Sequence, residues 1–334
     1  PKSAATVRNE GASLMLLDTR DGTERPLITG IKSNLGYPRI SRSGKWASVV
    51  DPLAKVSYIV DLTAPSPQKR VLLQSSASWT FWWALAWWID PSDGTEYFIA
   101  GDNVPERGAT AIYKIKLNAD GTADMSGARE ITNSRNLDMD LAISLSADGK
   151  KLGGAFPWPD TKILDIASGQ LTDRHHSGEA FGCQPNLAPD NSYRFFHCEG
   201  EHKGIYMFPA NTATTPVDWY LGLGNNLAGI PLSTGVDFIS PRWTNHVQYY
   251  TVQTPGGADY DMYCGDVFSG DQEDCWMDEN GSLWNKTATQ VRTGLQMSKM
   301  PKFYLGKFSA DFKAQEKSIM IGADPRYFQY GGDG

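Results

Sequence analysis

Residues 141–172 read LAISLSADGKKLGGAFPWPDTKILDIASGQLT. Apolar and polar residues alternate here over short runs, which is the period of a β-strand with one buried face. The runs are bounded by SADG at 146–149 and by SG at 168–169, and these residue types are typical of tight turns. The segment therefore predicts short antiparallel strands joined by turns, and it shows no helical period.

The same order of strands and turns recurs along the chain. One four-stranded unit cannot bury both of its faces, whereas units stacked around an axis bury them against each other. Residues 5–28 resemble the later strands of a further unit, for which 323–330 could supply the first strand. We therefore expect an all-β fold, a β-propeller of six four-stranded antiparallel blades, with five or seven blades as alternatives. The full units span 38–73, 85–121, 141–172, 184–210, and 237–255 continued at 302–322.

One propeller domain accounts for the whole chain, 1–334, with a long insertion at about 257–300. The four cysteines form two pairs that are close in sequence, which suits two disulfides and an oxidising compartment. Zinc is the alternative, but the tight spacing that zinc sites need is missing. We expect a secreted or periplasmic protein with the pairs Cys183–Cys198, which end opposite each other in the fourth blade, and Cys264–Cys275 in the insertion.

Charge and hydropathy exclude two classes of partner. The net charge of −7 provides no basic face for a phosphate backbone, so we expect no nucleic acid partner. The apolar run WTFWWALAWWI at 79–89 has 11 residues and is shorter than the roughly 18 that a membrane span requires. We therefore expect no transmembrane segment. Nothing in the sequence indicates the oligomeric state.

Tryptophans are concentrated at 79–88, where five of the eleven lie. Trp87 and Trp88 fall in the first strand of the second blade and are expected to pack between blades. The earlier three precede that strand, where they could stack on sugar rings or pack beneath the insertion. Such crossovers and the loops between second and third strands reach one face of the ring. On that face we expect a poly- or oligosaccharide to contact Trp79, Trp82, Trp83, Trp158 and Glu199.

Three turn sequences resemble those of the TolB-like β-propeller repeat: SRSGKWAS at 41–48, SADGKKL at 146–152 and APDNSYRF at 188–195. The resemblance covers most of the chain and implies the propeller fold. It does not select a function, because this scaffold carries binding proteins, peptidases and polysaccharide lyases. The G-x-S-x-G motif of the peptidase class is absent from the sequence.

Four of the five histidines are predicted on the same face as the crossover tryptophans, and HCEGEH at 197–202 is predicted to be a loop. Imidazoles with carboxylates suit a divalent metal, although loop histidines are often only solvent-exposed. The run LAPDNSYRFFHCEGEH at 187–202 resembles one blade of oligogalacturonate lyases, which bind a divalent cation through histidines. That resemblance implies His197 or His202 as a ligand of the cation, another histidine as the base, and Arg107 as the partner of the substrate acid. We expect a site for Mn²⁺ or Zn²⁺ with His197, His202 and Glu201 as its ligands, and His175 or His176 as the base.

These observations leave three functions. The first is carbohydrate recognition by a secreted propeller, the second is a metal-dependent polysaccharide lyase, and the third is a protein-interaction scaffold. Ca²⁺ is a further candidate metal, in the acidic insertion at 265–282. The distinctive PRWTNH at 241–246 falls at a turn on the opposite face, where we expect Trp243 and His246 to be structural.

Overall fold

The computed structural model confirms an all-β architecture with one short 3₁₀ turn, Met125–Gly127, among the described residues. Within these residues no helix has the length and apolar character needed to span a membrane. The structure describes 12–18, 20–21, 23–31, 36–51, 54–75, 83–104, 108–132, 143–156, 160–174, 182–199, 204–208, 219–222, 239–254, 276–277, 283–284, 290–292, 302–312 and 315–322.

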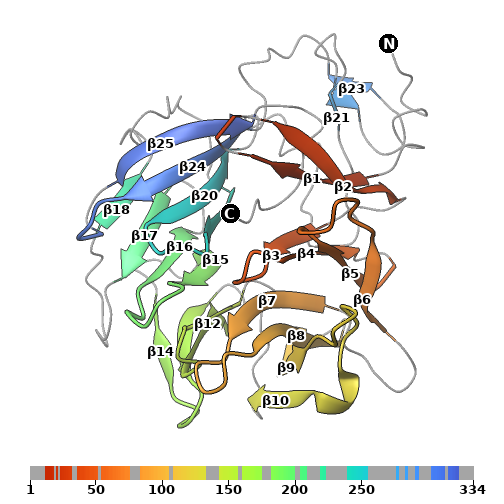
Figure 1. The fold of residues 1–334 in the computed structure, drawn as a ribbon. Helices are drawn as coiled ribbons and strands as arrows, with labels where there is room; N and C mark the ends of the chain where they lie inside the picture. The colour runs from red at the N-terminus through yellow and green to blue at the C-terminus, as the bar shows by residue number, and fades with distance from the viewer. Residues whose placement is uncertain are drawn as a thin grey trace.

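Five four-stranded antiparallel sheets form the blades, with the first strand of each blade nearest the axis (Figure 1). The first blade comprises β3 (Gly36–Ile40), β4 (Trp46–Asp51), β5 (Val56–Asp61) and β6 (Arg70–Gln74). The second comprises β7 (Trp83–Ile89), β8 (Glu96–Val104), β9 (Gly108–Lys116) and β10 (Arg129–Thr132). The third comprises β11 (Ser144–Leu145), β12 (Lys151–Ala155), β13 (Thr161–Asp165) and β14 (Leu171–Asp173).

The last two blades complete the described set. The fourth comprises β15 (Gly182–Leu187), β16 (Phe195–Glu199), β17 (Gly204–Phe208) and β18 (Trp219–Gly222). The fifth comprises β19 (Ile239–Trp243), β20 (Tyr249–Thr254), β24 (Lys302–Phe308) and β25 (Gln315–Gly322). Between β20 and β24 the chain forms a separate three-stranded sheet of β21 (Trp276–Met277), β22 (Leu283–Trp284) and β23 (Gln290–Arg292). The fifth blade is therefore interrupted where the sequence predicts an insertion.

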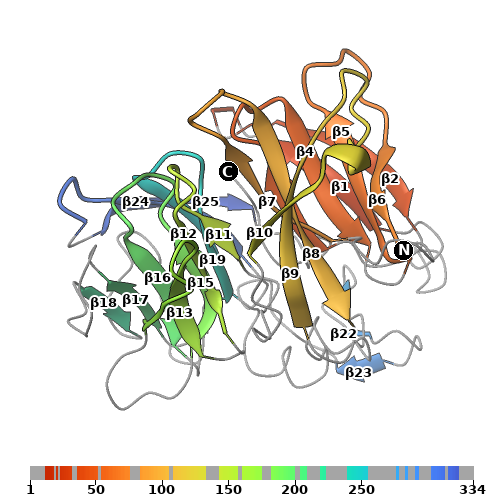
Figure 2. The same ribbon diagram turned by 90° about the horizontal axis from the view of Figure 1, so that it is seen from below.

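A two-stranded sheet of β1 (Ala12–Leu17) and β2 (Glu24–Ile31) lies between the first and fifth blades (Figure 1). Figure 2 shows the same sheet beside the strands of the first blade, and the buried Leu27 and Ile28 pack there against Val49 and Val60. The described residues thus form five four-stranded blades, one of the predicted alternatives, and a two-stranded sheet at a further place in the ring. The strand expected at 323–330 lies outside the described residues.

Adjacent blades are joined by the two tryptophans of β7, as the sequence predicts. The Trp87 indole is buried, and its Nε1 donates a hydrogen bond to the Ser48 Oγ of the first blade at 3.0 Å. The Trp88 indole is also buried, and its Nε1 donates to the Ala147 carbonyl of the third blade at 3.0 Å. Each ring thus removes apolar surface from water on one side of the second blade while its polar atom is satisfied.

Candidate functional site

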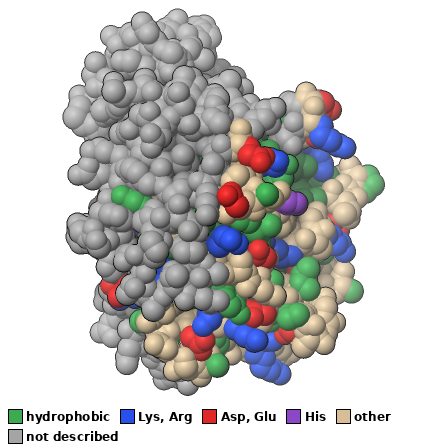
Figure 3. All heavy atoms as spheres, turned by 90° about the vertical axis from the view of Figure 1, so that its left-hand side faces the viewer, with side chains coloured by type: hydrophobic (Ala, Val, Ile, Leu, Met, Phe, Trp, Pro, Cys, Tyr) green, Lys and Arg blue, Asp and Glu red, His purple; other side chains and the backbone are tan. Residues whose placement is uncertain are grey.

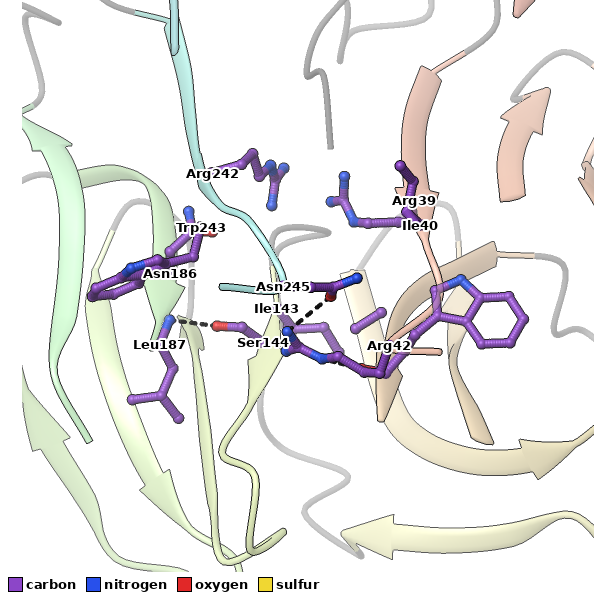
Figure 4. Close-up of a pocket in the computed structure, with 12 residues that line it drawn as sticks. Arg39, Ile40, Arg42, Ile143, Ser144, Asn186, Leu187, Arg242, Trp243 and Asn245 are labelled. Carbon is purple, nitrogen blue, oxygen red and sulfur yellow. Dashed lines mark hydrogen bonds between the residues drawn. The ribbon is translucent and has the colours of Figure 1, made fainter. Parts of the chain in front are cut away.

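A hollow lies on the axis, near the ends of the first strands (Figure 4). The empty space within it is about 450 Å³, and this figure includes space open to solvent. The hollow opens beside the turns that join the first and second strands of the blades, which we call the inner turns. The lining residues are Arg39, Ile40, Arg42, Ala86, Trp87, Ile143, Ser144, Asn186, Leu187, Arg242, Trp243 and Asn245.

Four polar side chains of this lining occupy equivalent positions of the repeat. In four blades the last paired residue of the first strand, just before the inner turn, is apolar. These residues are Ile40, Leu145, Leu187 and Trp243. The next residue back along the first strand is polar in each blade, in the order Arg39, Ser144, Asn186 and Arg242. Equal register around a ring places these four residues at a similar depth along the axis.

Two of the four residues are buried arginines. Arg39 on β3 is 6% exposed and Arg242 on β19 is 4% exposed. Figure 4 shows their side chains extending toward each other across the hollow. The Arg39 Nη1 donates a hydrogen bond to the Pro38 carbonyl at 2.8 Å. Since a guanidinium stays protonated in proteins, the hollow holds permanent positive charge.

The rim of the hollow connects the inner turns of the first and fifth blades. The Arg42 Nη1 donates to the Asn245 Oδ1 at 3.1 Å, and its Nε donates to the Trp87 carbonyl at 3.3 Å. The Asn245 Nδ2 in turn donates to the Ser41 carbonyl at 2.9 Å. Three hydrogen bonds thus hold Arg42 and Asn245 in place between blades that are far apart in the sequence.

The third and fourth blades contribute uncharged hydrogen-bonding groups. The Ser144 Oγ accepts a hydrogen bond from the Leu187 amide at 2.5 Å, which ties β11 to β15 and leaves the hydroxyl proton available to donate. Asn186 is 5% exposed and lies next to Leu187 on the same strand. The third and fourth blades therefore add amide and hydroxyl groups to the guanidinium groups of the first and fifth blades.

The described lining consists of guanidinium, amide, hydroxyl and apolar side chains. Its described residues include no His, Cys, Asp or Glu, which are the usual general bases and metal ligands. Across the described part of the chain, no three such residues are grouped so that they could hold a metal ion. Guanidinium, amide and hydroxyl groups bind oxygen atoms of carboxylates, phosphates and sugar hydroxyls.

One predicted site residue, His197, occupies a different element from the one expected. The loop predicted at 197–202 begins later, because β16 continues through Glu199. His197 is fully buried in that strand, and its ring stacks on Phe208 with a centroid distance of 5.4 Å and an interplanar angle of 15°. Tyr206 lies 5.6 Å from the same ring. His197 is therefore part of the aromatic core of the fourth blade, and its role in metal binding stays a prediction.

Four other predicted residues are described as backbone positions. Trp83 begins β7 instead of preceding it, and Glu199 ends β16 instead of lying in a loop. Cys183 and Cys198 are direct partners in the β15–β16 ladder, which confirms the predicted register, and the disulfide between them stays a prediction. Outside the described residues lie Trp79, Trp82, Arg107, Trp158, His175, His176, Glu201, His202, Cys264 and Cys275.

Sequence reasoning missed the axial residues although a signal was present. PRISR at 38–42 and PRWTN at 241–245 share a Pro-Arg pair at the same place in the first and fifth blades. The inner turn at Thr244 follows the predicted register, closed by the Thr244 amide on the Tyr249 carbonyl at 3.0 Å. Trp243 is buried and donates to the Val247 carbonyl at 2.6 Å, which supports its predicted structural role. Trp243 also lines the hollow, a role that its position in the sequence does not reveal.

The fold is similar to that of solved TolB structures. The putative TolB from Agrobacterium tumefaciens aligns with a TM-score of 0.51 at 15% identity, over 93% of this chain and 98% of that chain. TolB from Acinetobacter baumannii aligns with a TM-score of 0.51 at 15% identity, over 94% of this chain and 60% of that chain. At this identity the similarity shows a TolB-like propeller fold and leaves function open. No protein-family model and no curated protein matches the chain.

Proposed function

We propose that this chain is a secreted binding protein that binds an oligosaccharide at the axial hollow. The observation that carries the proposal is the repeated register, which brings one polar side chain from each of four first strands to the same depth of the ring. Rigid strands position such groups more accurately than loops do, and this favours recognition of a defined ligand.

The chemistry of the lining suits sugar oxygens. Arg39 and Arg242 donate only, whereas the amide of Asn186 and the hydroxyl of Ser144 both donate and accept, as sugar hydroxyls do. Trp243 and Leu187 provide the apolar part of the lining. A few converging polar groups in a partly apolar hollow are typical of small-ligand sites.

Binding without turnover is the better-supported form of this function. Removal of a proton next to a uronate carboxylate requires a general base, and none is present among the described lining residues. The alternative lyase places its base at His175 or His176 and its metal ligands at His202 and Glu201, outside the described residues. Detection of product therefore separates the two functions directly.

The proposed compartment depends on the cysteines. The ladder position of Cys183 opposite Cys198 supports a disulfide, because residues that face each other across an antiparallel pair have Cα atoms about 4.5 to 5.5 Å apart, within the range of about 4.4 to 6.8 Å that disulfides span. We expect thiol-alkylating reagents to modify the four cysteines of the unfolded protein only after reduction. Full alkylation of the protein, purified from its native compartment, without reduction would contradict an oxidising location.

The proposed function is tested with a panel of oligosaccharides and two matched variants. Asn245→Ala removes the rim amide and is expected to weaken binding about fivefold, the effect of one hydrogen bond. Asn118→Ala is the control, because the Asn118 side-chain amide donates to the Thr122 hydroxyl in an exposed turn of the second blade. Affinities measured by calorimetry should change for the first variant alone.

Other results would direct the assignment elsewhere. A loss of binding in Trp82→Ala, with Asn245→Ala unaffected, would move the sugar site to the predicted crossover platform. Ultraviolet absorbance from unsaturated uronate products would establish the lyase. If no oligosaccharide binds, the proposal fails and the protein-interaction scaffold becomes the leading alternative.

A further inference from the structure

We infer that the ligand of the axial hollow is acidic: an oligosaccharide with a uronate carboxylate that binds between Arg39 and Arg242. This inference rests on the proposed function and specifies its substrate class. It requires a site that differs in charge from the rest of the protein, a geometry that fits a carboxylate, and neighbouring groups that bind hydroxyls.

The described lining of the hollow differs in charge from the chain as a whole. The protein carries a net charge of −7, but the described lining includes three arginines and no acidic residue. On the described part of the surface in Figure 3, Lys and Arg side chains are interspersed with Asp and Glu. Among the described residues, the lining therefore gathers side chains of one sign of charge, and such a group attracts an anion to a particular point on an acidic protein.

The geometry of the arginines fits a carboxylate. Arg39 and Arg242 occupy the same register position of the first and fifth blades, are more than nine-tenths buried, and extend toward each other across the hollow (Figure 4). A guanidinium presents five N–H donors in a planar fork, which matches the two oxygens of a carboxylate. The inference does not require either guanidinium to lack partners in the protein, because its contacts with the chain and with a ligand can use different N–H groups.

Neighbouring groups favour a sugar acid over a simple anion. Asn186 and Ser144 line the same hollow at the equivalent register position of the fourth and third blades, and Asn245 lies at the rim. Amide and hydroxyl groups at this position can bind the hydroxyls of the ring that carries the carboxylate. Arg42 is fixed by Trp87 and Asn245 at the rim, where its charge adds to the attraction of an acidic chain.

The first experiment leaves the protein unchanged and alters the ligand. Calorimetry on the full chain compares a galacturonic acid trisaccharide with its methyl ester and with a neutral galactose trisaccharide. Esterification removes the negative charge and retains the ring and its hydroxyls. We expect the acid to bind at least about tenfold more tightly than either neutral ligand, with an affinity that falls as salt is added.

The second experiment alters the arginines. Arg39→Gln and Arg242→Gln are each expected to reduce affinity for the acid about tenfold or more and to leave affinity for the neutral trisaccharide within about threefold. Arg242→Lys retains the charge without the planar fork and should give an intermediate loss. Arg20→Gln is the matched control, because Arg20 pairs with Asp18 at an exposed position and is not among the lining residues.

The outcomes distinguish this inference from the proposed function. Equal affinity for acid and ester overturns the inference and leaves an oligosaccharide-binding protein. Binding of a tetraglutamate peptide with no sugar bound overturns the saccharide in both proposals. If no probe binds, both fail. If the buried arginine variants do not fold, the comparison of acid with ester on the unaltered protein still decides.

Discussion

The inner turns of the second and third blades differ from those of the first and fifth blades. In the second blade, Asp90 accepts hydrogen bonds from Ser92 and from Lys114 Nζ at 2.8 Å within the same sheet. In the third, Asp148 accepts from the Tyr193 hydroxyl of the fourth blade at 2.6 Å. In the first and fifth blades, Arg42 and Asn245 bond each other at the axial hollow.

The difference shows that one backbone turn serves two purposes. The turns at Ser41, Asp90, Ser146 and Thr244 are each closed by an amide of the first residue on a carbonyl five residues later. Because main-chain hydrogen bonds close these turns, the side chains within each turn can either stabilise the blades or line the axial hollow. A turn motif therefore identifies the scaffold and does not reveal which blades form the site.

The largest expected effect concerns two glycines at equivalent inner turns. Gly149 has φ +69°, and a Cβ there would lie 2.5 Å from Cζ2 of the buried Trp88 indole. Gly44 has φ +72° with nothing within 4 Å of a Cβ. We expect Gly149→Ala to reduce the free energy of unfolding by about 3 to 4 kcal/mol, from backbone strain and overpacking together, and Gly44→Ala by about 1 kcal/mol from strain alone.

Urea unfolding of both variants measures this difference. Both glycines have left-handed backbone conformations, so the strain of an alanine is similar at the two positions. The difference between the two losses of unfolding free energy therefore measures the contact between the second and third blades. Equal losses in the two variants would show that the Trp88 indole moves aside without cost. That result would contradict tight packing between the second and third blades at Gly149.

The next largest effect is the pH dependence of Asp90. The Lys114 ammonium, with the hydroxyl and amide of Ser92, lowers the pKa of the Asp90 carboxyl to about 2. A carboxyl with a lowered folded-state pKa stabilises the fold above its unfolded pKa of about 3.9, and this contribution disappears as the pH falls toward 2. We expect Asp90→Asn to cost about 1 to 2 kcal/mol at pH 7, with a smaller difference at pH 3.

Asp93→Asn is the control in the same turn. Its carboxylate is exposed and accepts from the Thr95 amide at 2.8 Å, so a loss below about 0.5 kcal/mol is expected. Urea unfolding at pH 7, 5 and 3 compares the two variants. A difference that stays constant down to pH 3 would mean that the Lys114 pair does not account for the stability that Asp90 provides.

The fold was readable from the sequence because its signals are local. Strand alternation, turn residues and the positions of Trp87 and Trp88 lie within single blades, and the structure confirms them. The outer strands of two blades extend past the predicted units, because long connections separate β10 and β18 from the strands before them. His197 was assigned to a loop because a polar residue between aromatic ones does not by itself show that its side chain is buried in a strand.

The axial site was harder to predict, because its residues come together only when the ring closes. Arg39 and Arg242 stand in similar Pro-Arg contexts about two hundred residues apart, and neither context contains a catalytic or metal-binding motif. The sequence suggested chemistry at histidines and tryptophans, whose side chains are distinctive in composition. The residues that line the axial hollow are instead arginine, serine and asparagine, and they are brought together by the register of strands from different blades.

The smallest expected effect on stability belongs to the rim. Arg42 and Asn245 bond at 3.1 Å near the surface, so Arg42→Gln and Asn245→Ala should each cost at most about 1 kcal/mol, with a coupling of about 0.5 kcal/mol in the double variant. The Arg42 loss should be constant from pH 7 to 3, because a guanidinium does not titrate in this range. Urea unfolding at pH 7 and pH 3 compares the loss of unfolding free energy in Arg42→Gln with that in Asp90→Asn. If Arg42→Gln reduces the free energy of unfolding as much as Asp90→Asn does, the rim stabilises the fold as the other turns do. If the reduction is small and ligand binding weakens, the rim belongs to the binding site.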